Sequence, residues 1–218
     1  MNTAPITSTE MDEILKNKKN SLAVIRAFDA LASLGGIVVL SPFLILAGLA
    51  VKVSSKGPIL YSQERIGRNQ KPFRIHKFRT MVQDADKMGT LVTVSNDQRI
   101  TKVGRMLRRT KLDELPQLFN VLKGEMALVG PRPEVKRYVD HYDENALQLL
   151  RLRPGVTDLA SIEYSRESEL LDAADDVEKV YIEEIMPAKH ALNYAYIRQL
   201  GFWNNIKVLA LTLKKLMK

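Results

Sequence analysis

The sequence predicts an α+β fold that is mostly helical, with one small β-hairpin and a membrane-associated segment near the N-terminus. Three observations indicate this fold class. Residues 30–51 form an uncharged run, two short strand-like stretches flank "RNQ" at 68–70, and helical apolar spacing recurs through much of the remaining chain. With 218 residues the chain can bury one sizeable core, and without cysteine it has neither disulfides nor thiolate ligands.

The uncharged run is "ALASLGGIVVLSPFLILAGLAV". As a helix it would measure about 33 Å, enough to cross a hydrocarbon core of ~30 Å. Pro42 removes the amide that would bond the Val38 carbonyl, although the Ser41 hydroxyl can act as a local partner. The arms on either side of the proline, at about 18 and 15 Å, are each too short to span a bilayer. We therefore expect a re-entrant helix broken at Ser41–Pro42.

Cationic residues flank this run on both sides. They are Lys16, Lys18, Lys19 and Arg26 before it, and Lys52, Lys56, Arg65 and Arg68 after it. Because cations favour the cytoplasmic side, a hairpin that enters and leaves one leaflet satisfies both flanks, whereas a single span does not. A Pro-kinked span is the main alternative. A buried core helix and a cleaved signal peptide fit less well, because no polar stripe interrupts the run and the first 20 residues are polar.

Local signals place the other elements. "PILYSQERIG" and "KPFRIHKFRTM" predict the β-hairpin, and "MALVGPRPE" predicts a short strand that enters a Pro-fixed loop. Helices are expected over 96–110 with Asn96 or Asp97 as the cap, from an Asp113 N-cap to Gly124, and over 134–152, 167–185 and 187–200.

The C-terminal stretch predicts a basic amphipathic helix. Its lysines lie largely away from an apolar stripe formed by Phe202, Ile206, Leu209, Leu213 and Leu216. Such a helix can lie in a membrane interface with Trp203 at headgroup depth, or it can pack on the core of the domain. The sequence leaves both arrangements open.

The net charge of +8 is concentrated in blocks. Residues 64–111 carry 13 Lys/Arg against 4 Asp/Glu, residues 163–184 carry 9 acidic against 2 basic residues, and residues 185–218 carry 6 basic residues and no acidic one. Basic blocks indicate an anionic partner, which could be nucleic acid, anionic lipid or a phosphorylated substrate. A solvated surface is the alternative.

Two adjacent acids follow the first basic block. Asp113 and Glu114 come directly after a set of cations, Arg105, Arg108, Arg109 and Lys111. Basic neighbours are expected to keep both carboxylates ionised and to hold a diphosphate beside them. Paired carboxylates also suit Mg²⁺, and a carboxylate can attack phosphorus to form an acyl phosphate. Alternatively, Asp113 is only a helix cap, Glu114 serves the helix dipole and the arginines are solvated.

The stretch "KLDELPQLFNVLKGEMALVGPRP" at 111–133 closely resembles the bacterial initiating sugar transferases, which are monotopic polyprenyl-phosphate phosphoglycosyl transferases. Further matches occur in the same order: Ser41–Pro42 in the hydrophobic segment, "KFRTM" at 77–81, Arg108 before the acidic pair, and "RPGVT" at 153–157. The resemblance runs from about residue 22 to about residue 160.

This resemblance implies a reaction. A sugar 1-phosphate passes from a UDP-sugar to a polyprenyl phosphate such as undecaprenyl phosphate, UMP is released, and glycoconjugate synthesis begins. Asp113 would attack the β-phosphorus, so that a phosphosugar-aspartyl intermediate forms in a ping-pong cycle. Asp113 and Glu114 would hold Mg²⁺, and Glu114 would also be a catalytic candidate that sits in the metal site or assists proton and metal handling. The resemblance also implies that both ends of the re-entrant helix face the cytoplasm at the bacterial inner membrane.

Other residues receive roles from the same resemblance. Arg108 would hold phosphate, and Arg132, fixed in a stiff loop with Pro131, would lie near the nucleotide or phosphate. Lys77 and Arg79 are phosphate-side candidates whose alternative is a plain hairpin surface. Arg153 is a substrate-binding candidate that would serve equally as a structural salt-bridge partner.

The expected division of the chain is a polar N-terminal segment (1–21), a re-entrant membrane helix (22–56), a cytosolic catalytic domain (57–200) and an amphipathic C-terminal helix (201–218). On the resemblance this is the minimal form, without the extra N-terminal membrane helices of larger relatives. The pattern departs after "RPGVT", where Asp158 and an acidic continuation replace the Gly and Trp/Ala-Gln stretch of many relatives. The sugar therefore stays open, as does a homodimer through helices that expose Leu147, Leu149 or Leu150.

Two other functions compete with this hypothesis. A membrane-tethered nucleic-acid-binding module would use the basic block at 64–111, but that block carries no recognised motif, and we expect no nucleic-acid partner. A carboxylate- and Mg²⁺-dependent phosphohydrolase would use the same acids with water as the acceptor. Histidine metal sites, P-loop kinases and Rossmann dehydrogenases have no matching motif.

Overall fold

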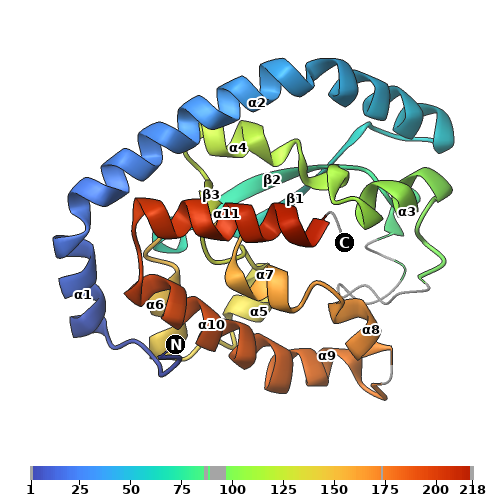
Figure 1. The fold of residues 1–218 in the computed structure, drawn as a ribbon. Helices are drawn as coiled ribbons and strands as arrows, with labels where there is room; N and C mark the ends of the chain where they lie inside the picture. The colour runs from blue at the N-terminus through green and yellow to red at the C-terminus, as the bar shows by residue number, and fades with distance from the viewer. Residues whose placement is uncertain (1, 86–87, 89–96, 173, 217–218) are drawn as a thin grey trace.

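A computed structural model describes residues 2–85, 88, 97–172 and 174–216 (Figure 1). Its helices are α1 (Ser8–Asn17), α2 (Lys19–Ser54), α3 (Lys102–Arg109), α4 (Gln117–Lys123), α5 (Lys136–Val139), α6 (Glu144–Leu149), α7 (Leu159–Glu163), α8 (Glu167–Leu171), α9 (Val177–Val180), α10 (Met186–Arg198) and α11 (Phe202–Leu216). Its strands are β1 (Leu60–Ile66), β2 (Pro72–Phe78), β3 (Ala127–Val129) and β4 (Gly155–Thr157). The prediction of a mostly helical protein with a small antiparallel hairpin is confirmed.

The apolar run lies within α2, which arcs over the rest of the molecule (Figure 1). The helix is continuous across Ser41–Pro42, so the expected break there is wrong for this structure. The reason is local, because the Ser41 hydroxyl donates a hydrogen bond to the Val38 carbonyl over 2.8 Å. This bond replaces the one that Pro42 cannot donate, and it lets the helix bend without opening.

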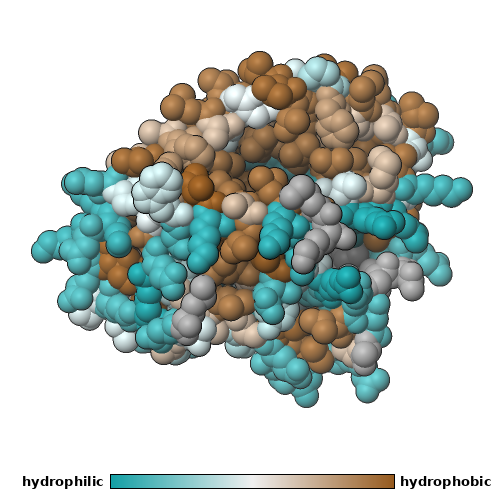
Figure 2. Space-filling model, in the orientation of Figure 1, coloured by the Kyte–Doolittle hydropathy of each residue, from teal (hydrophilic) through white to brown (hydrophobic). Residues whose placement is uncertain are grey.

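The outer face of α2 is apolar and exposed. Figure 2 shows hydrophobic side chains gathered over this edge, and the exposed ones of α2 are Val24, Leu31, Leu34, Val38, Val39, Phe43, Ile45, Leu46, Leu49 and Val53. Within the described ranges, α2 is the one helix long and apolar enough to cross a membrane, and only 17% of its most apolar window is buried. The core helix of a water-soluble domain would be mostly buried, so the exposure favours membrane association.

Two small sheets organise the middle of the chain. Strands β1 and β2 pair antiparallel, with Tyr61 opposite Lys77, and they are joined by a turn in which Asn69 and Gln70 have positive φ. Strands β3 and β4 pair in parallel, with Ala127 opposite Gly155. The sequence analysis did not foresee β4, because three residues give too short a pattern to detect.

Three expected helices differ in their boundaries. Thr101 caps α3 by accepting a 2.9 Å bond from the Gly104 amide, whereas Asp97 pairs with Arg99, and Asn96 lies outside the described residues. The expected helix over 134–152 is two helices, α5 and α6, because Asp143 caps α6 at the Ala146 amide. The expected helix over 167–185 is α8, α9 and a π-helical turn (Tyr181–Ile185) that leads directly into α10.

Both terminal helices pack on the same core. Ile6 and Met11, at the start of the chain and in α1, are fully buried in a cluster with residues of α10 and α11. Two ion pairs hold α1, one from Asp12 to Arg151 just after α6 and one from Glu10 to Arg198 in α10. In α11, Val208 is buried, whereas Trp203 keeps 79% of its surface exposed. The C-terminal helix therefore packs on the core with one face and leaves its tryptophan outside.

Candidate active site

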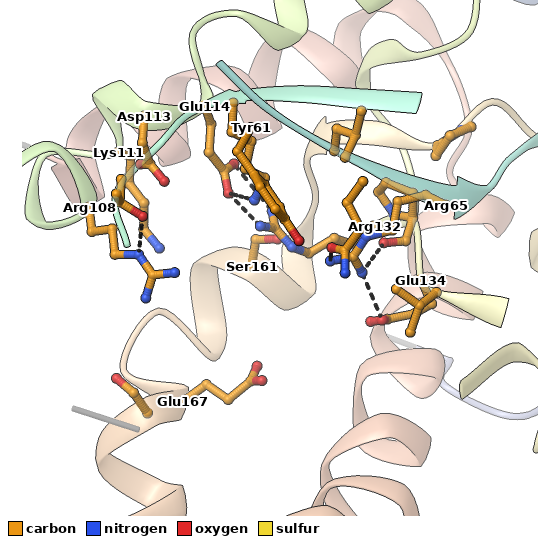
Figure 3. Close-up of a pocket in the computed structure, with 18 of the residues that line it drawn as sticks. Tyr61, Arg65, Arg108, Lys111, Asp113, Glu114, Arg132, Glu134, Ser161 and Glu167 are labelled. Atoms are coloured by element: carbon orange, nitrogen blue, oxygen red, sulfur yellow. Dashed lines mark hydrogen bonds and ion pairs between the residues drawn. The ribbon is translucent and has the colours of Figure 1, made fainter. Parts of the chain in front are cut away.

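A large cavity opens beside the hairpin. It measures about 1720 Å³ and is lined by both strands of the hairpin, α3, the turn that carries Asp113, the Pro131–Pro133 loop, α7 and α10. Figure 3 shows Asp113, Lys111 and Arg108 at one side of this cavity and Arg65 and Glu134 at the other. Ligand sites usually occupy ~300–1,000 Å³, so the space suffices for a substrate with several groups.

A strained turn delivers the acidic pair to the cavity. Lys111 has φ +56° and ψ +16°, a left-handed conformation that is uncommon for a residue with a side chain. A 3₁₀ turn (Leu112–Glu114) follows, and Pro116 rather than Asp113 occupies the N-cap of α4. The prediction of Asp113 as a helix cap is therefore wrong. Its side chain is free for another role, and strain beside it is typical of functional sites.

Asp113 is buried without a full set of partners. Its exposed fraction is 7%, and its Oδ1 has no hydrogen-bond partner in the described structure. Burial and the neighbouring Glu114 raise the pKa of Asp113, and the charges of Lys77 and Arg108 only partly oppose this. We expected the cations to dominate, but desolvation outweighs them because the carboxylate lies away from water.

Glu114 has the opposite environment. It accepts a 2.8 Å bond from Lys77 Nζ at Oε1, and Arg132 binds both of its oxygens. Burial alone would raise the pKa of Glu114, but Arg132 and Lys77 together hold it well below its usual value. The two adjacent acids thus differ. Glu114 is firmly ionised, whereas Asp113 lacks part of its hydrogen bonds. Such a contrast between neighbouring carboxyl groups is a feature of catalytic sites.

Arg108 reaches the cavity because α3 lies unusually close to the end of β2. A Cβ on Gly104 would meet the Thr80 carbonyl oxygen at 1.9 Å, so only glycine permits this approach. One turn later, Arg108 Nε donates a 2.9 Å bond to Thr80 Oγ1. The remaining guanidinium nitrogens of Arg108 point into the space below Asp113 (Figure 3). Arg108 and Asp113 therefore line the same cavity, and the phosphate-binding role of Arg108 stays a prediction.

The Pro131–Pro133 loop is held by a residue whose role the sequence analysis missed. Asp158 is fully buried, accepts a 3.3 Å bond from the Arg132 amide, and caps α7 by a 2.6 Å bond from the Ser161 amide. The Pro131 carbonyl also accepts a 3.0 Å bond from Gly155. These bonds fix the backbone from which Arg132 reaches Glu114. An aspartate just before an apolar segment is a cap signal that could have indicated part of this role.

Two predicted substrate-binding residues are engaged elsewhere. Arg79 donates bonds to the carbonyl oxygens of Val51 and Ser55 at 3.3 and 2.6 Å, so its guanidinium closes the C-terminal end of α2. Arg153 lines a separate small cavity beside α2, and its Nε donates a 2.9 Å bond to the Gly124 carbonyl. This bond to a carbonyl gives Arg153 a structural contact, although the structural alternative in the sequence analysis was a salt bridge. Arg79 lines the edge of the large cavity, and its guanidinium also has a structural role at the end of α2.

The acidic pair is compatible with a divalent cation. The described residues contain no cluster of three or more His, Cys, Asp or Glu side chains suited to a metal. Mg²⁺, however, is commonly bound through one or two carboxylates plus substrate phosphates and water. The unpaired Oδ1 of Asp113 offers one such ligand, and the oxygens of Glu114 have lone pairs beyond those used by Lys77 and Arg132.

Comparison with known proteins identifies the family. A family model described as "Bacterial sugar transferase" matches residues 20–218. The chain belongs to the bacterial sugar transferase family. A relative from Aeromonas hydrophila named UDP-N-acetylgalactosamine-undecaprenyl-phosphate N-acetylgalactosaminephosphotransferase is 32% identical over 95% of this chain and 48% of its own length. The undecaprenyl-phosphate glucose phosphotransferase of Komagataeibacter xylinus is 40% identical over 87% of this chain and 35% of its own length.

A further bacterial sugar transferase relative is the UDP-glucose:undecaprenyl-phosphate glucose-1-phosphate transferase of Escherichia coli K12. It is 39% identical over 87% of this chain and 39% of its own length. The chain thus spans less than half of the length of these three relatives. Their names share an undecaprenyl-phosphate substrate but differ in the sugar.

Proposed function

We propose that this bacterial sugar transferase moves a sugar 1-phosphate from a UDP-sugar to polyprenyl phosphate, with undecaprenyl phosphate as the acceptor, and releases UMP. The observation that carries the proposal is the buried, unpaired oxygen of Asp113 at the cationic end of a large cavity. Membership of the family and the names of the relatives support the reaction class.

In the proposed mechanism Asp113 is the nucleophile. An oxygen of its carboxylate attacks the β-phosphorus of the donor, the bond from that phosphorus to the bridging oxygen breaks, and UMP leaves with the bonding electrons. The sugar phosphate is then joined to Asp113 as an acyl phosphate. An oxygen of polyprenyl phosphate attacks the same phosphorus, and the Asp113 carboxylate is regenerated. Arg108 and Lys111 lie where they would counter the developing negative charge.

A bound Mg²⁺ at Asp113 and Glu114 would supply charge neutralisation for the diphosphate. The chain's own residues prepare the site independently of it. Lys77 and Arg132 fix the rotamer of Glu114 from two sides, and the buried Asp158 holds the loop that presents Arg132. The nucleophile is therefore placed beside groups that cannot swing away.

We further propose that α2 is re-entrant, with both of its ends on the cytoplasmic face of the bacterial inner membrane. Helix α1 before it and the hairpin after it belong to one packed body, as the ion pair between Arg198 and Glu10 and the buried Met11 indicate. A membrane-crossing α2 would require α1 to leave this core. The curved course of α2 (Figure 1) and its exposed apolar outer face support shallow insertion into one leaflet.

The absence of cysteine in the chain makes this topology directly testable. We expect Asn17→Cys and Lys56→Cys, both at exposed positions flanking α2, to react with a membrane-impermeant maleimide only when it is applied from the cytoplasmic side. Labelling would be compared in spheroplasts and in inverted membrane vesicles. Reaction of the two cysteines from opposite sides would show a membrane-spanning helix and contradict the proposal.

The reaction is tested by UMP release from a panel of UDP-sugars, with and without undecaprenyl phosphate and with Mg²⁺ present or chelated. We expect sustained release only with lipid and Mg²⁺, and an acid-labile sugar phosphate on the protein when lipid is omitted. Continued turnover to free sugar phosphate without lipid would instead indicate a phosphohydrolase. Salt-sensitive binding of duplex DNA without any release of UMP would indicate a nucleic-acid-binding module.

A further inference from the structure

Four residues that line the cavity beyond the acidic pair each carry a buried polar atom that lacks a hydrogen-bond partner in the described structure. The atoms are Arg65 Nε, the Tyr138 hydroxyl, the Ser161 hydroxyl and the side-chain oxygen of Asn193. We call these four residues the far wall. They come from β1, α5, α7 and α10, and Figure 3 shows Ser161 below Glu114 and Arg65 beside Glu134.

Unpaired buried polar atoms are uncommon, because each one loses its hydrogen bonds to water without replacement. Four of them on residues that line one cavity therefore need an explanation other than stability. The atoms are shielded from solvent in the structure, so a ligand would reach them through small side-chain rotations, which are frequent on binding. A ligand that paired with them would remove the cost of leaving them unpaired.

The charge of the cavity changes along its length. Arg108, Lys111 and the ion-paired Lys77 surround the acidic pair at one end. At the far wall the charges are already compensated, because Glu134 accepts a 3.4 Å bond from Arg65 Nη1 and a 2.6 Å bond from the Tyr181 hydroxyl. The first end suits a diphosphate. The far wall suits a neutral group with several hydrogen-bonding positions.

The aromatic rings at the far wall do not favour a stacked base. Tyr138 packs on Tyr181 with ring centres 4.9 Å apart, and Tyr142 packs on His190 at 4.5 Å. Lys189 lies over the ring of Tyr181. Because these faces contact other side chains, the wall offers hydroxyl and amide groups more than flat apolar surfaces. A sugar, whose hydroxyls both donate and accept, matches these groups better than a nucleobase does.

We propose that the far wall binds the sugar of the donor and discriminates between sugars by hydrogen bonds from Tyr138, Ser161 and Asn193. This inference rests on the proposed function, since it assigns one part of the same substrate. It explains how the cavity can hold a charged diphosphate at Asp113 and a neutral ring beyond it.

Two conservative substitutions test the proposal, Tyr138→Phe and Ser161→Ala. Each removes one hydroxyl that has no partner among the described residues, so neither is expected to lower the free energy of unfolding. Each should weaken binding of the preferred UDP-sugar by roughly threefold to tenfold, the effect of one hydrogen bond, and leave binding of UDP unchanged. Tyr194→Phe is the matched control, because Tyr194 is buried in the core cluster beside α11 and does not line the cavity.

Binding would be measured by calorimetry on the full chain in nanodiscs, with UDP, UDP-glucose, UDP-galactose and their two N-acetylamino counterparts. Kinetics would add the ratio of kcat/KM between sugars, which a purely structural role would not change. Equal losses for UDP and UDP-sugars would assign the wall to the nucleoside and overturn the proposal, as would no loss for either. A wild-type protein that bound neither UDP nor any UDP-sugar would refute the proposed function itself, and the sugar site with it.

Discussion

Replacing Asp113 by asparagine is expected to reduce turnover by at least about 10³-fold, the scale seen when a catalytic nucleophile is removed. Asparagine has nearly the same shape, but its amide cannot form the acyl phosphate. The substitution lies away from α2, so membrane association should be unchanged. UMP release in the presence of undecaprenyl phosphate measures the loss, and loss of the covalent sugar phosphate on the protein identifies its cause. Full activity of Asp113→Asn would refute the covalent mechanism.

The same substitution should stabilise the protein at neutral pH. Burial raises the pKa of Asp113, so the folded state binds this proton more tightly than the unfolded state does. The stability due to this difference is complete below the unfolded pKa and is lost as pH rises through the folded pKa. At pH 7 the buried ionised carboxylate is therefore a cost that asparagine removes. Thermal unfolding should show a higher Tm for Asp113→Asn at pH 7, and the gain should shrink in acid.

Asp140→Asn is the matched control for both measurements. Asp140 forms an exposed i,i+4 pair with Lys136, and its side chain keeps 56% of its surface accessible. Such pairs contribute little, so neither turnover nor Tm should change measurably. A Tm of Asp113→Asn below that of the wild type at pH 7 would show that the cations outweigh the burial after all.

Replacing Glu114 by glutamine has the second large expected effect, and it acts on stability as well as on turnover. The change removes the charge that Lys77 and Arg132 share, and both cations keep only part of their surface in water, at 21% and 35%. Loss of one partner from a fully buried pair costs ~3–5 kcal/mol, so about 2–3 kcal/mol is expected at this partly exposed site. Denaturant unfolding at pH 7 measures the loss.

The stability that Glu114 contributes should depend on pH in a defined direction. The pKa of Glu114 is held well below its usual value, so its contribution to stability is present above the unfolded pKa and is lost as pH falls through the folded one. The difference between wild type and Glu114→Gln should therefore be full at pH 7 and should decrease only in strong acid. Turnover should also fall, because Arg132 is no longer fixed.

Glu169→Gln provides the comparison, since Glu169 pairs with Arg166 at 3.9 Å and both side chains are mostly exposed. No measurable change in the free energy of unfolding is expected for it. If Glu114→Gln proved as stable as Glu169→Gln, the bonds of Glu114 to Lys77 and Arg132 would not be holding the site together.

Some functional features are local enough to be predicted from sequence. The uncharged run, the two hairpin strands and the adjacent acids Asp113 and Glu114 are each contained in a short stretch, and their patterns depend on neighbouring residues alone. Even the role of Ser41 followed from its position, three residues after the Val38 carbonyl that Pro42 leaves without an amide. The resemblance of residues 111–133 to a known family predicted the reaction.

The tertiary structure decided which hydrogen-bond partners each of these residues has. The sequence predicted the same ionised state for Asp113 and Glu114. In the structure Arg132 and Lys77, which lie on separate elements, both bind Glu114 and leave Asp113 buried and incompletely paired. Arg79 was assigned to the phosphates, although its guanidinium reaches the end of α2.

The physical reason is that desolvation and hydrogen bonding depend on which distant segments meet. A residue's neighbours in the chain fix its backbone tendencies, and these gave the helices and the hairpin. Its charge state and its available lone pairs depend on packing between elements far apart in sequence, as between Asp158 and the Arg132 loop. By itself the sequence determined the long apolar helix, the hairpin and the acidic pair, whereas only the fold decided which acid is left unpaired in the cavity.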